Sequence, residues 1–176
     1  GLGRAPGTDR LTMRALRRDR VETEDDFPRE VAELQRLLGD PQPDQQVIAM
    51  PGAGTRVPIW LLGSSLFSAQ LAAERGLPYA FASHFAPRLL HQAIDLYRGR
   101  FRPSEVLAEP YVMIGVPLVA APADAEAEFL ASSVFQRVLG ILHGDRRCLP
   151  PPVAGFMAGL HPQERAGIAD FLGAAV

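Results

Sequence analysis

The sequence predicts an α/β protein built on a parallel sheet. Three short apolar runs alternate with segments of helical periodicity, and the runs begin at residues 57, 77 and 111. Each run is continuously apolar instead of alternating with polar residues, which is typical of strands buried on both faces of a parallel sheet. The intervals between the runs are long enough for one crossover helix each, so the pattern indicates consecutive βα units.

The expected elements follow from apolar spacing and from residues that start or stop helices. Pro28 suits the first turn of a helix that Gly39 ends. Gly76 closes another helix in the same way. The predicted strands cover 57–62, 77–83 and 111–120, the predicted helices cover 9–20, 28–38, 68–75, 88–100, 124–140 and 162–174, and the long loops cover 40–58 and 148–162.

The length and composition indicate one ordinary domain. The chain has 176 residues with a net charge of −2, and 47% of its side chains are apolar. A domain takes roughly 150 residues, so a single domain is expected over 1–176. A charge so near zero offers no field for nucleic acid or an anionic membrane, and no apolar run approaches the roughly 18 residues of a transmembrane helix. The cytoplasm is the expected location.

The residue types present narrow the possible chemistry. All 18 basic residues are arginine, and asparagine is also absent, which indicates a GC-rich bacterial genome. Without lysine, this chain offers no Schiff-base chemistry and no lysine-dependent phosphate loop. The four histidines and Cys148 show no metal-ligand spacing, so no metal site is predicted. No G-x-S-x-G segment supports a hydrolase nucleophile.

The strongest candidate site follows the first apolar run. Parallel βα proteins bind ligands at the carboxyl ends of their strands, and this run ends at Gly63, where the backbone is open to a ligand. Ser64 and Ser65 then precede a helix, and Ser68 lies one turn further. The free N–H groups and positive dipole end of that helix, together with three hydroxyls, suit a phosphate. The alternative is that Ser64 or Ser65 only caps the helix.

Three further candidates lie at other expected strand ends. Arg4 follows the opening tripeptide, which is expected to end a strand, and its planar fork suits a phosphate or a polar ring. A surface arginine is the alternative. Ser83 and His84 end the second apolar run, and the other three histidines are expected on helices or loops. The opening glycines are spaced one residue too widely for the dinucleotide motif G-x-G-x-x-G.

Several segments of the chain match a known family in order. They read GLGRAPGTD at 1–9, DDFP at 25–28, VPIWLLGSS at 57–65 and GLPYAFASHFAP at 76–87. Shorter matches are FRPS at 101–104 and LPPPV at 149–153. Together they resemble the luciferase-like monooxygenases, the FMN-dependent relatives of bacterial luciferase, over essentially the whole chain.

The resemblance implies a (β/α)8 barrel that binds FMN, in preference to F420, at the carboxyl ends of its strands. It assigns the phosphate cradle to Gly63, Ser64, Ser65 and Ser68. Arg14, by itself a solvated charge, is implied to pair with the phosphate. The implied flavin-site residues are Arg4, Ala5, Pro6, Arg14, Gly63, Ser64, Ser65, Ser68 and Ser83, with His84 as the candidate catalytic residue.

The resemblance also implies a reaction and partners. Reduced FMN and O2 are expected to oxidise a small organic substrate such as an aldehyde, while the protein positions the flavin and excludes water. A separate flavin reductase is the implied supplier of reduced flavin, and a homo-oligomer is the implied assembly.

The chain departs from the family pattern at both ends. Members have three further strands before the position of Gly1 and continue beyond that of Val176, so the chain corresponds to about strands four to seven. A complete barrel takes about 250 residues. The alternative function is therefore a non-oxygenating flavin-binding or truncated barrel protein that works only in an assembly.

Overall fold

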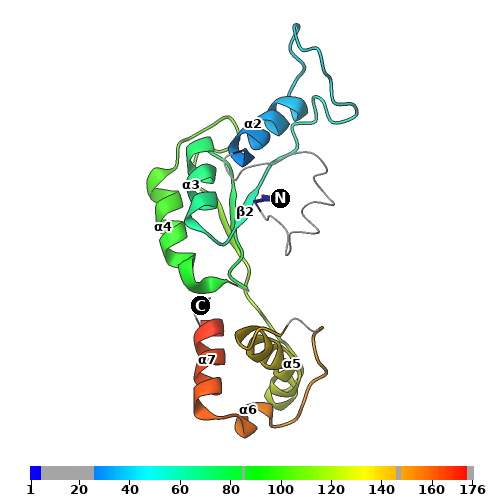
Figure 1. Ribbon diagram of the computed structural model, residues 1–176. Helices are drawn as coiled ribbons and strands as arrows, with labels where there is room; N and C mark the ends of the chain where they lie inside the picture. Colours follow the sequence, from blue (N-terminus) through cyan, green and yellow to red (C-terminus); the bar gives the residue numbers. More distant parts are fainter. Residues whose placement is uncertain (5–25, 85, 146–147, 174–176) are drawn as a thin grey trace. The chain divides into compact units, whose positions relative to one another are not determined.

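The computed structural model describes residues 1–4, 26–84, 86–145 and 148–173 (Figure 1). The helix predicted over 9–20 lies outside these described residues. The chain divides into two compact units, Gly1–Phe81 with His91–Met113 and Ala82–Leu90 with Ile114–Val176. The sequence predicts a single domain over 1–176, and the division into two compact units does not test that prediction.

The first unit is built on a four-stranded sheet, whose strands in spatial order are β1 (Leu2–Gly3), β2 (Leu61–Gly63), β3 (Tyr79–Phe81) and β4 (Val112–Ile114). The β1–β2 and β2–β3 pairs are parallel, and Leu61 lies opposite both Leu2 and Tyr79. The predicted α/β class with a parallel sheet is confirmed, and so is the strand expected in the opening residues.

The strands are shorter than predicted. The apolar runs 57–62, 77–83 and 111–120 each yield a strand of three residues. Each run contains proline, at Pro58, Pro78 and Pro117. Proline has no backbone N–H to donate to a sheet, so the hydrogen-bonded ladder begins after the first two prolines and ends before the third.

The core of the first unit lies between this sheet and its helices, which are α2 (Phe27–Leu38), α3 (Leu66–Arg75) and α4 (Leu90–Arg100). Helices α3 and α4 lie on the same side of β2 (Figure 1). Ala69, Ala72 and Ala73 of α3 are fully buried, and their small side chains let the helix approach the sheet closely. Leu61 of β2, the strand that α3 contacts, is fully buried, whereas 42% of Leu62, on the opposite face of the strand, is exposed.

One tyrosine hydroxyl joins three segments of this core. Tyr97 of α4 is fully buried and donates a hydrogen bond to the Leu77 carbonyl at 3.0 Å. Its oxygen accepts a hydrogen bond from the Tyr111 N–H at 3.1 Å. Burial raises the pKa of the Tyr97 phenol, and the backbone hydrogen bond at Tyr111 partly offsets that rise. Helix α4 is thereby fixed to the beginnings of β3 and β4.

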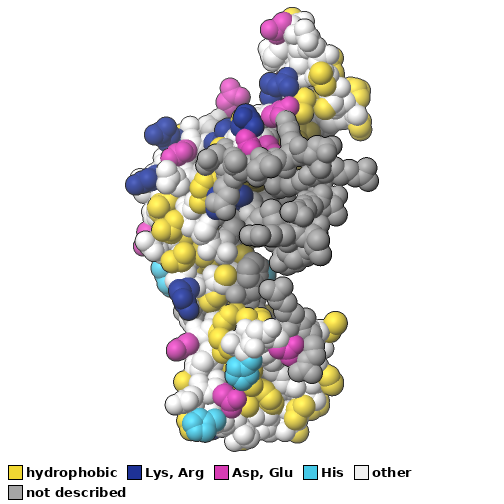
Figure 2. Space-filling view, in the orientation of Figure 1, with side chains coloured by type: hydrophobic (Ala, Val, Ile, Leu, Met, Phe, Trp, Pro, Cys, Tyr) yellow, Lys and Arg dark blue, Asp and Glu magenta, His cyan; other side chains and the backbone are white. Residues whose placement is uncertain are grey.

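Helix α2 is tied to α3 by a single arginine. The Arg75 guanidinium donates to the Pro28 carbonyl at 2.6 Å and to the Gln35 side-chain oxygen at 3.3 Å. Pro28 lies in the first turn of α2, as predicted, and Gly39 caps its end. The predicted loop 40–58 then contains no helix or strand. Its apolar side chains lie at the surface (Figure 2), where Val47 is 66% and Met50 77% exposed.

The second unit is helical, with η1 (Pro87–Leu89), α5 (Asp124–Leu142), α6 (Phe156–Gly159) and α7 (Pro162–Gly173). Helix α6 lies inside the predicted loop 148–162. The buried Ser132 hydroxyl of α5 donates to the Phe129 carbonyl at 2.5 Å and accepts from the Val153 N–H at 2.8 Å. The Gln136 side chain donates to the Pro151 carbonyl at 2.9 Å. These bonds hold the proline-rich segment against α5.

Among the described residues, no helix is long and apolar enough to cross a membrane.

Candidate functional site

The strongest sequence candidate forms a tight turn between a strand and a helix. Strand β2 ends at Gly63 and α3 begins at Leu66, so Ser64 and Ser65 make up the whole connection. Ser65 occupies the N-cap position with extended backbone angles, φ −132° and ψ 164°. Within the described chain its hydroxyl makes no capping hydrogen bond, and the first turn of α3 contains no acidic residue. The first N–H groups of a helix have no partner within the helix, so this end of α3 favours an anion.

Gly63 is required here by packing. A Cβ on Gly63 would lie 2.7 Å from the Ser68 Cβ and closer still to the Ser68 hydroxyl oxygen. Real Cβ atoms essentially never come so near another atom. From the sequence alone, this glycine was expected only to expose backbone to a ligand. Its contact with Ser68 also seats the first turn of α3 against the end of β2.

Ser68 differs from the other two serines in its surroundings. Only 4% of Ser68 is exposed, and its hydroxyl donates a hydrogen bond to the Ser65 carbonyl at 3.0 Å. The Tyr79 hydroxyl lies 3.5 Å from the same carbonyl. Burial raises the pKa of the Tyr79 phenol, and a hydrogen bond with Ser68 acts in the opposite direction. Ser68 and Tyr79 therefore support the turn from the core side, while Ser64 and Ser65 are only partly buried.

Arg4 lies at the same edge of the sheet as this turn. Gly3, the last residue of β1, pairs with Leu62, so Arg4 directly after β1 and Gly63 at the end of β2 are the next residues along neighbouring chain segments. The guanidinium carbon of Arg4 lies 4.0 Å from the ring centroid of Phe67, in the first turn of α3. The structure thus brings Arg4 together with Gly63, Ser64 and Ser65. Phe67 was not a sequence candidate, because an aromatic residue at the start of an apolar helix is typical of packing alone.

Ser83 and His84 belong to the second unit. Ser83 is buried, and its hydroxyl donates to the Gly115 carbonyl at 2.6 Å. His84 is exposed, and a Cβ on Gly115 would lie 2.5 Å from its Nδ1. Ser83 therefore links the end of β3 to the segment after β4. The remaining candidates, Ala5, Pro6 and Arg14, lie outside the described residues.

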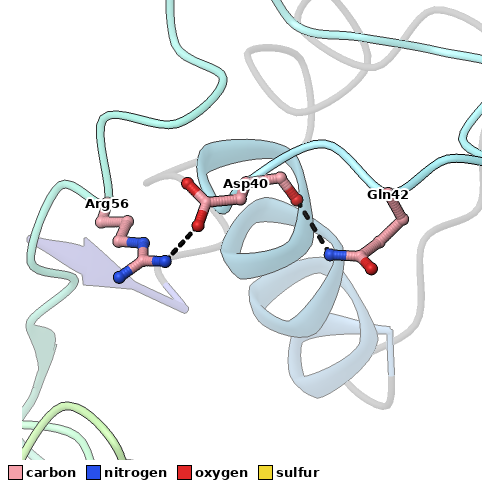
Figure 3. Close-up of polar contacts among 3 residues, drawn as sticks. All are labelled: Asp40, Gln42 and Arg56. Atoms are coloured by element: carbon pink, nitrogen blue, oxygen red, sulfur yellow. Dashed lines mark hydrogen bonds and ion pairs between the residues drawn. The ribbon is translucent and has the colours of Figure 1, made fainter.

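Two pockets lie away from these residues. One of about 590 Å³ lies beside the carboxyl end of α2, where Arg56 and Asp40 form an ion pair and Gln42 donates to the Asp40 carbonyl at 3.1 Å (Figure 3). The other, of about 550 Å³, is lined by the second half of α5 and by Cys148 and Phe156. Neither is lined by a residue of the predicted flavin site.

Among the described residues, no group of three or more His, Cys, Asp or Glu side chains is placed to hold a metal ion.

Comparison with known proteins identifies the family. The profile described as luciferase-like monooxygenase matches residues 8–167. The chain belongs to the luciferase-like monooxygenase family. A protein of Escherichia coli K12 named "Luciferase-like monooxygenase" is 48% identical over 172 residues, which are 98% of this chain and 51% of that protein. The "Uncharacterized protein YvbT" of Bacillus subtilis is 48% identical over 179 residues, covering 100% of this chain and 52% of YvbT.

A solved structure extends the likeness to the fold. The crystal structure of apo-MsnO8 superposes on this luciferase-like chain with a TM-score of 0.72 at 29% identity, covering 98% of this chain and 59% of MsnO8. The luciferase-like chain spans about half the length of the curated relatives it matches. The family resemblance is therefore confirmed, together with an α/β fold that corresponds to part of a larger one.

Proposed function

We propose that this luciferase-like chain carries the flavin-phosphate-binding part of an FMN-dependent monooxygenase. The observation that supports it most is the pairing of two features at one sheet edge. The N-terminus of α3 has no side-chain cap from Ser65, and Arg4 directly follows the neighbouring strand β1. A phosphate there would meet helix N–H groups, a positive dipole end and a guanidinium together.

The residues of the turn suit a terminal phosphate group. Ser64 and Ser65 offer hydroxyls beside the first N–H groups of α3, while Gly63 and Ser68 fix the position of the turn. Arg4 would supply charge from β1, and the family resemblance assigns a second arginine, Arg14, to the same phosphate. Ala5 and Pro6 would flank the flavin. This set favours FMN, and F420 is the second choice.

The chemistry is divided between cofactor and protein. Reduced flavin, supplied by a separate reductase, provides the electrons with which O2 oxidises a small organic substrate such as an aldehyde. The residues of this chain bind the phosphate and orient the flavin. His84, exposed at the end of the second predicted strand, is the candidate for contact with the reacting groups, and Ser83 holds the backbone next to it. We extend the proposal to a homo-oligomeric, cytoplasmic enzyme.

Flavin titration tests the phosphate site directly. We expect the chain to quench FMN fluorescence on binding, and Ser65→Ala and Arg4→Gln each to weaken FMN affinity about tenfold or more, since a charge-assisted hydrogen bond contributes roughly 1.5–3 kcal/mol. Ser133→Ala, in the second unit, is the matched control and leaves the affinity unchanged. No binding at millimolar FMN would contradict the proposal, and unchanged affinity in both site variants would remove this turn from it.

Oxygen consumption separates the proposed enzyme from the second candidate function. That candidate is a flavin binder that does not oxygenate or that works only in an assembly. With NADH, FMN and a flavin reductase, we expect substrate-dependent oxygen uptake above the reductase background, and His84→Ala to lower it without changing FMN affinity. Binding without uptake supports the second candidate.

A further inference from the structure

Phe67 lies outside both the sequence candidates and the proposed site, yet it contacts one of the site's residues. Its ring centroid lies 4.0 Å from the guanidinium carbon of Arg4. Phe67 is the second residue of α3, and Arg4 directly follows β1, so the contact joins two separate elements. Both side chains are partly buried. An arginine over an aromatic face at this distance is a cation–π pair.

Such a pair fixes a cation without neutralising it. The attraction comes from the negative face of the ring, so the ring itself brings no opposite charge to the guanidinium. An arginine side chain also loses rotamer freedom when it binds a ligand, which weakens binding. A contact that already restricts the side chain lowers that cost in advance.

We propose that Phe67 is a positioning residue that holds the Arg4 guanidinium at the phosphate end of the flavin site. This inference rests on the proposed function. Phe67 acts through Arg4 and touches no reacting group. Arg4 directly follows the two-residue strand β1, and the ring of Phe67 contacts its guanidinium from a separate element, α3. The site thereby depends on an aromatic residue that forms no hydrogen bond to the ligand.

The proposal predicts an effect restricted to the phosphate. FMN and riboflavin share the same ring system, but riboflavin lacks the phosphate. Loss of the Phe67 ring should weaken FMN binding and leave riboflavin binding as it was. A residue with a merely structural role in α3 would affect both flavins alike.

The test compares Phe67→Leu with Phe67→Tyr in the full chain. A cation–π pair contributes about 0.5–1 kcal/mol at exposed sites, so we expect the Leu variant to bind FMN roughly two- to fivefold more weakly. The Tyr variant retains a ring, so its FMN affinity should match that of the unchanged chain. Phe101→Leu removes a ring that packs against Tyr97 on α4 and serves as the matched control. Phe67→Met replaces the Leu variant if that one does not fold.

A double-substitution cycle completes the test. With Arg4→Gln already present, Phe67→Leu should have no further effect on FMN affinity. Equal weakening of FMN and riboflavin, or the same loss in the Arg4→Gln background, would overturn the positioning role and leave the phosphate site standing. If the unchanged chain binds no FMN, the positioning role and the proposed function both fail.

Discussion

Gly63 faces Ser68 so closely that a methyl group on Gly63 would lie 2.7 Å from the Ser68 Cβ. The close approach joins the end of β2 to the first turn of α3. It occurs beside the two serines that form the candidate phosphate site. The packing of α3 against β2 and the proposed phosphate binding therefore depend on the same backbone position.

Gly63→Ala is expected to lower both stability and FMN affinity. The new Cβ must displace Ser68 and with it the start of α3, and overpacking of this kind costs about 1–3 kcal/mol. Urea unfolding and flavin titration measure the two effects. Gly99→Ala is the control, because Gly99 lies in α4 and a Cβ on it would meet nothing within 4 Å. That variant should be neutral or stabilising by up to about 1 kcal/mol. Equal changes in stability and in FMN affinity for Gly63→Ala and Gly99→Ala would contradict the crowding at Gly63.

Gly76→Ala is expected to be among the more damaging substitutions in the first unit. Gly76 ends α3 in the left-handed region, with φ 61°, and a Cβ there would lie 2.5 Å from the Arg102 carbonyl oxygen. Gly54 also has a positive φ, 76°, but a Cβ on it would meet only an ordinary contact at 3.8 Å. Gly54→Ala should cost about 1–2 kcal/mol from backbone strain alone. In urea unfolding, Gly76→Ala should lose clearly more stability than Gly54→Ala. A similar loss of stability in both variants would contradict the role of crowding at Gly76.

Tyr97→Phe should destabilise the first unit by about 1–3 kcal/mol. The change removes one hydroxyl and leaves two backbone groups without that partner, the Leu77 carbonyl at a buried bond and the Tyr111 N–H at a partly buried one. Thermal and urea unfolding measure the loss. Tyr111→Phe is the matched control, since Tyr111 is 56% exposed and keeps its ring contact with Trp60. A destabilisation no larger than that of the control would count against the hydrogen-bonded role of Tyr97.

Stability is expected to fall at alkaline pH because of the buried tyrosines. Burial raises the pKa of Tyr79 and of Tyr97 above the ordinary value of 10.0. Above about pH 10 the unfolded chain releases these protons more readily than the folded chain, so the free energy of unfolding decreases with pH. The stabilisation is complete below that pH and is lost as the pH rises through the folded pKa values. In urea titrations at alkaline pH, Tyr97→Phe should show a shallower decrease, and an unchanged slope would assign the effect to other groups.

Ser132→Ala should loosen the proline-rich segment from α5. The hydroxyl accepts the Val153 N–H at 2.8 Å, and its loss leaves that N–H without the bond. We expect faster amide exchange at Val153 and a stability loss of about 1–2 kcal/mol. Ser133→Ala removes the neighbouring buried hydroxyl and is the control. Unchanged exchange at Val153 would show that Gln136 and its bond to the Pro151 carbonyl suffice to hold the segment.

Much of the fold follows from local patterns in the sequence. Continuous apolar runs predicted the parallel sheet, and Pro28, Gly39 and Gly76 marked helix ends correctly. Strand length was overestimated because apolar periodicity does not register the N–H that each proline lacks. The short helix α6 was missed because four residues are too few for a periodic signal.

The site was predictable in outline and not in detail. The strand-end rule placed Arg4 and the Gly63–Ser65 turn at one edge, and the pairing of Gly3 with Leu62 brings them together. The sequence could not distinguish buried Ser68 from its partly buried neighbours, because three hydroxyls so close in the chain give no sign of which one faces the core. Nor could it indicate the Phe67 contact, which depends on two elements far apart in the chain meeting in space.

The connection between β2 and α3 consists of two residues and has no spare length. With Gly63 and Ser68 in contact across it, an added residue would have to separate the strand end from the helix start. The chemistry of this turn can therefore be changed only through side chains, those of Ser64 and Ser65 within it and that of Arg4 beside it. Redesign of the proposed phosphate site is thus a matter of a small library at these three positions, with the loop length held constant.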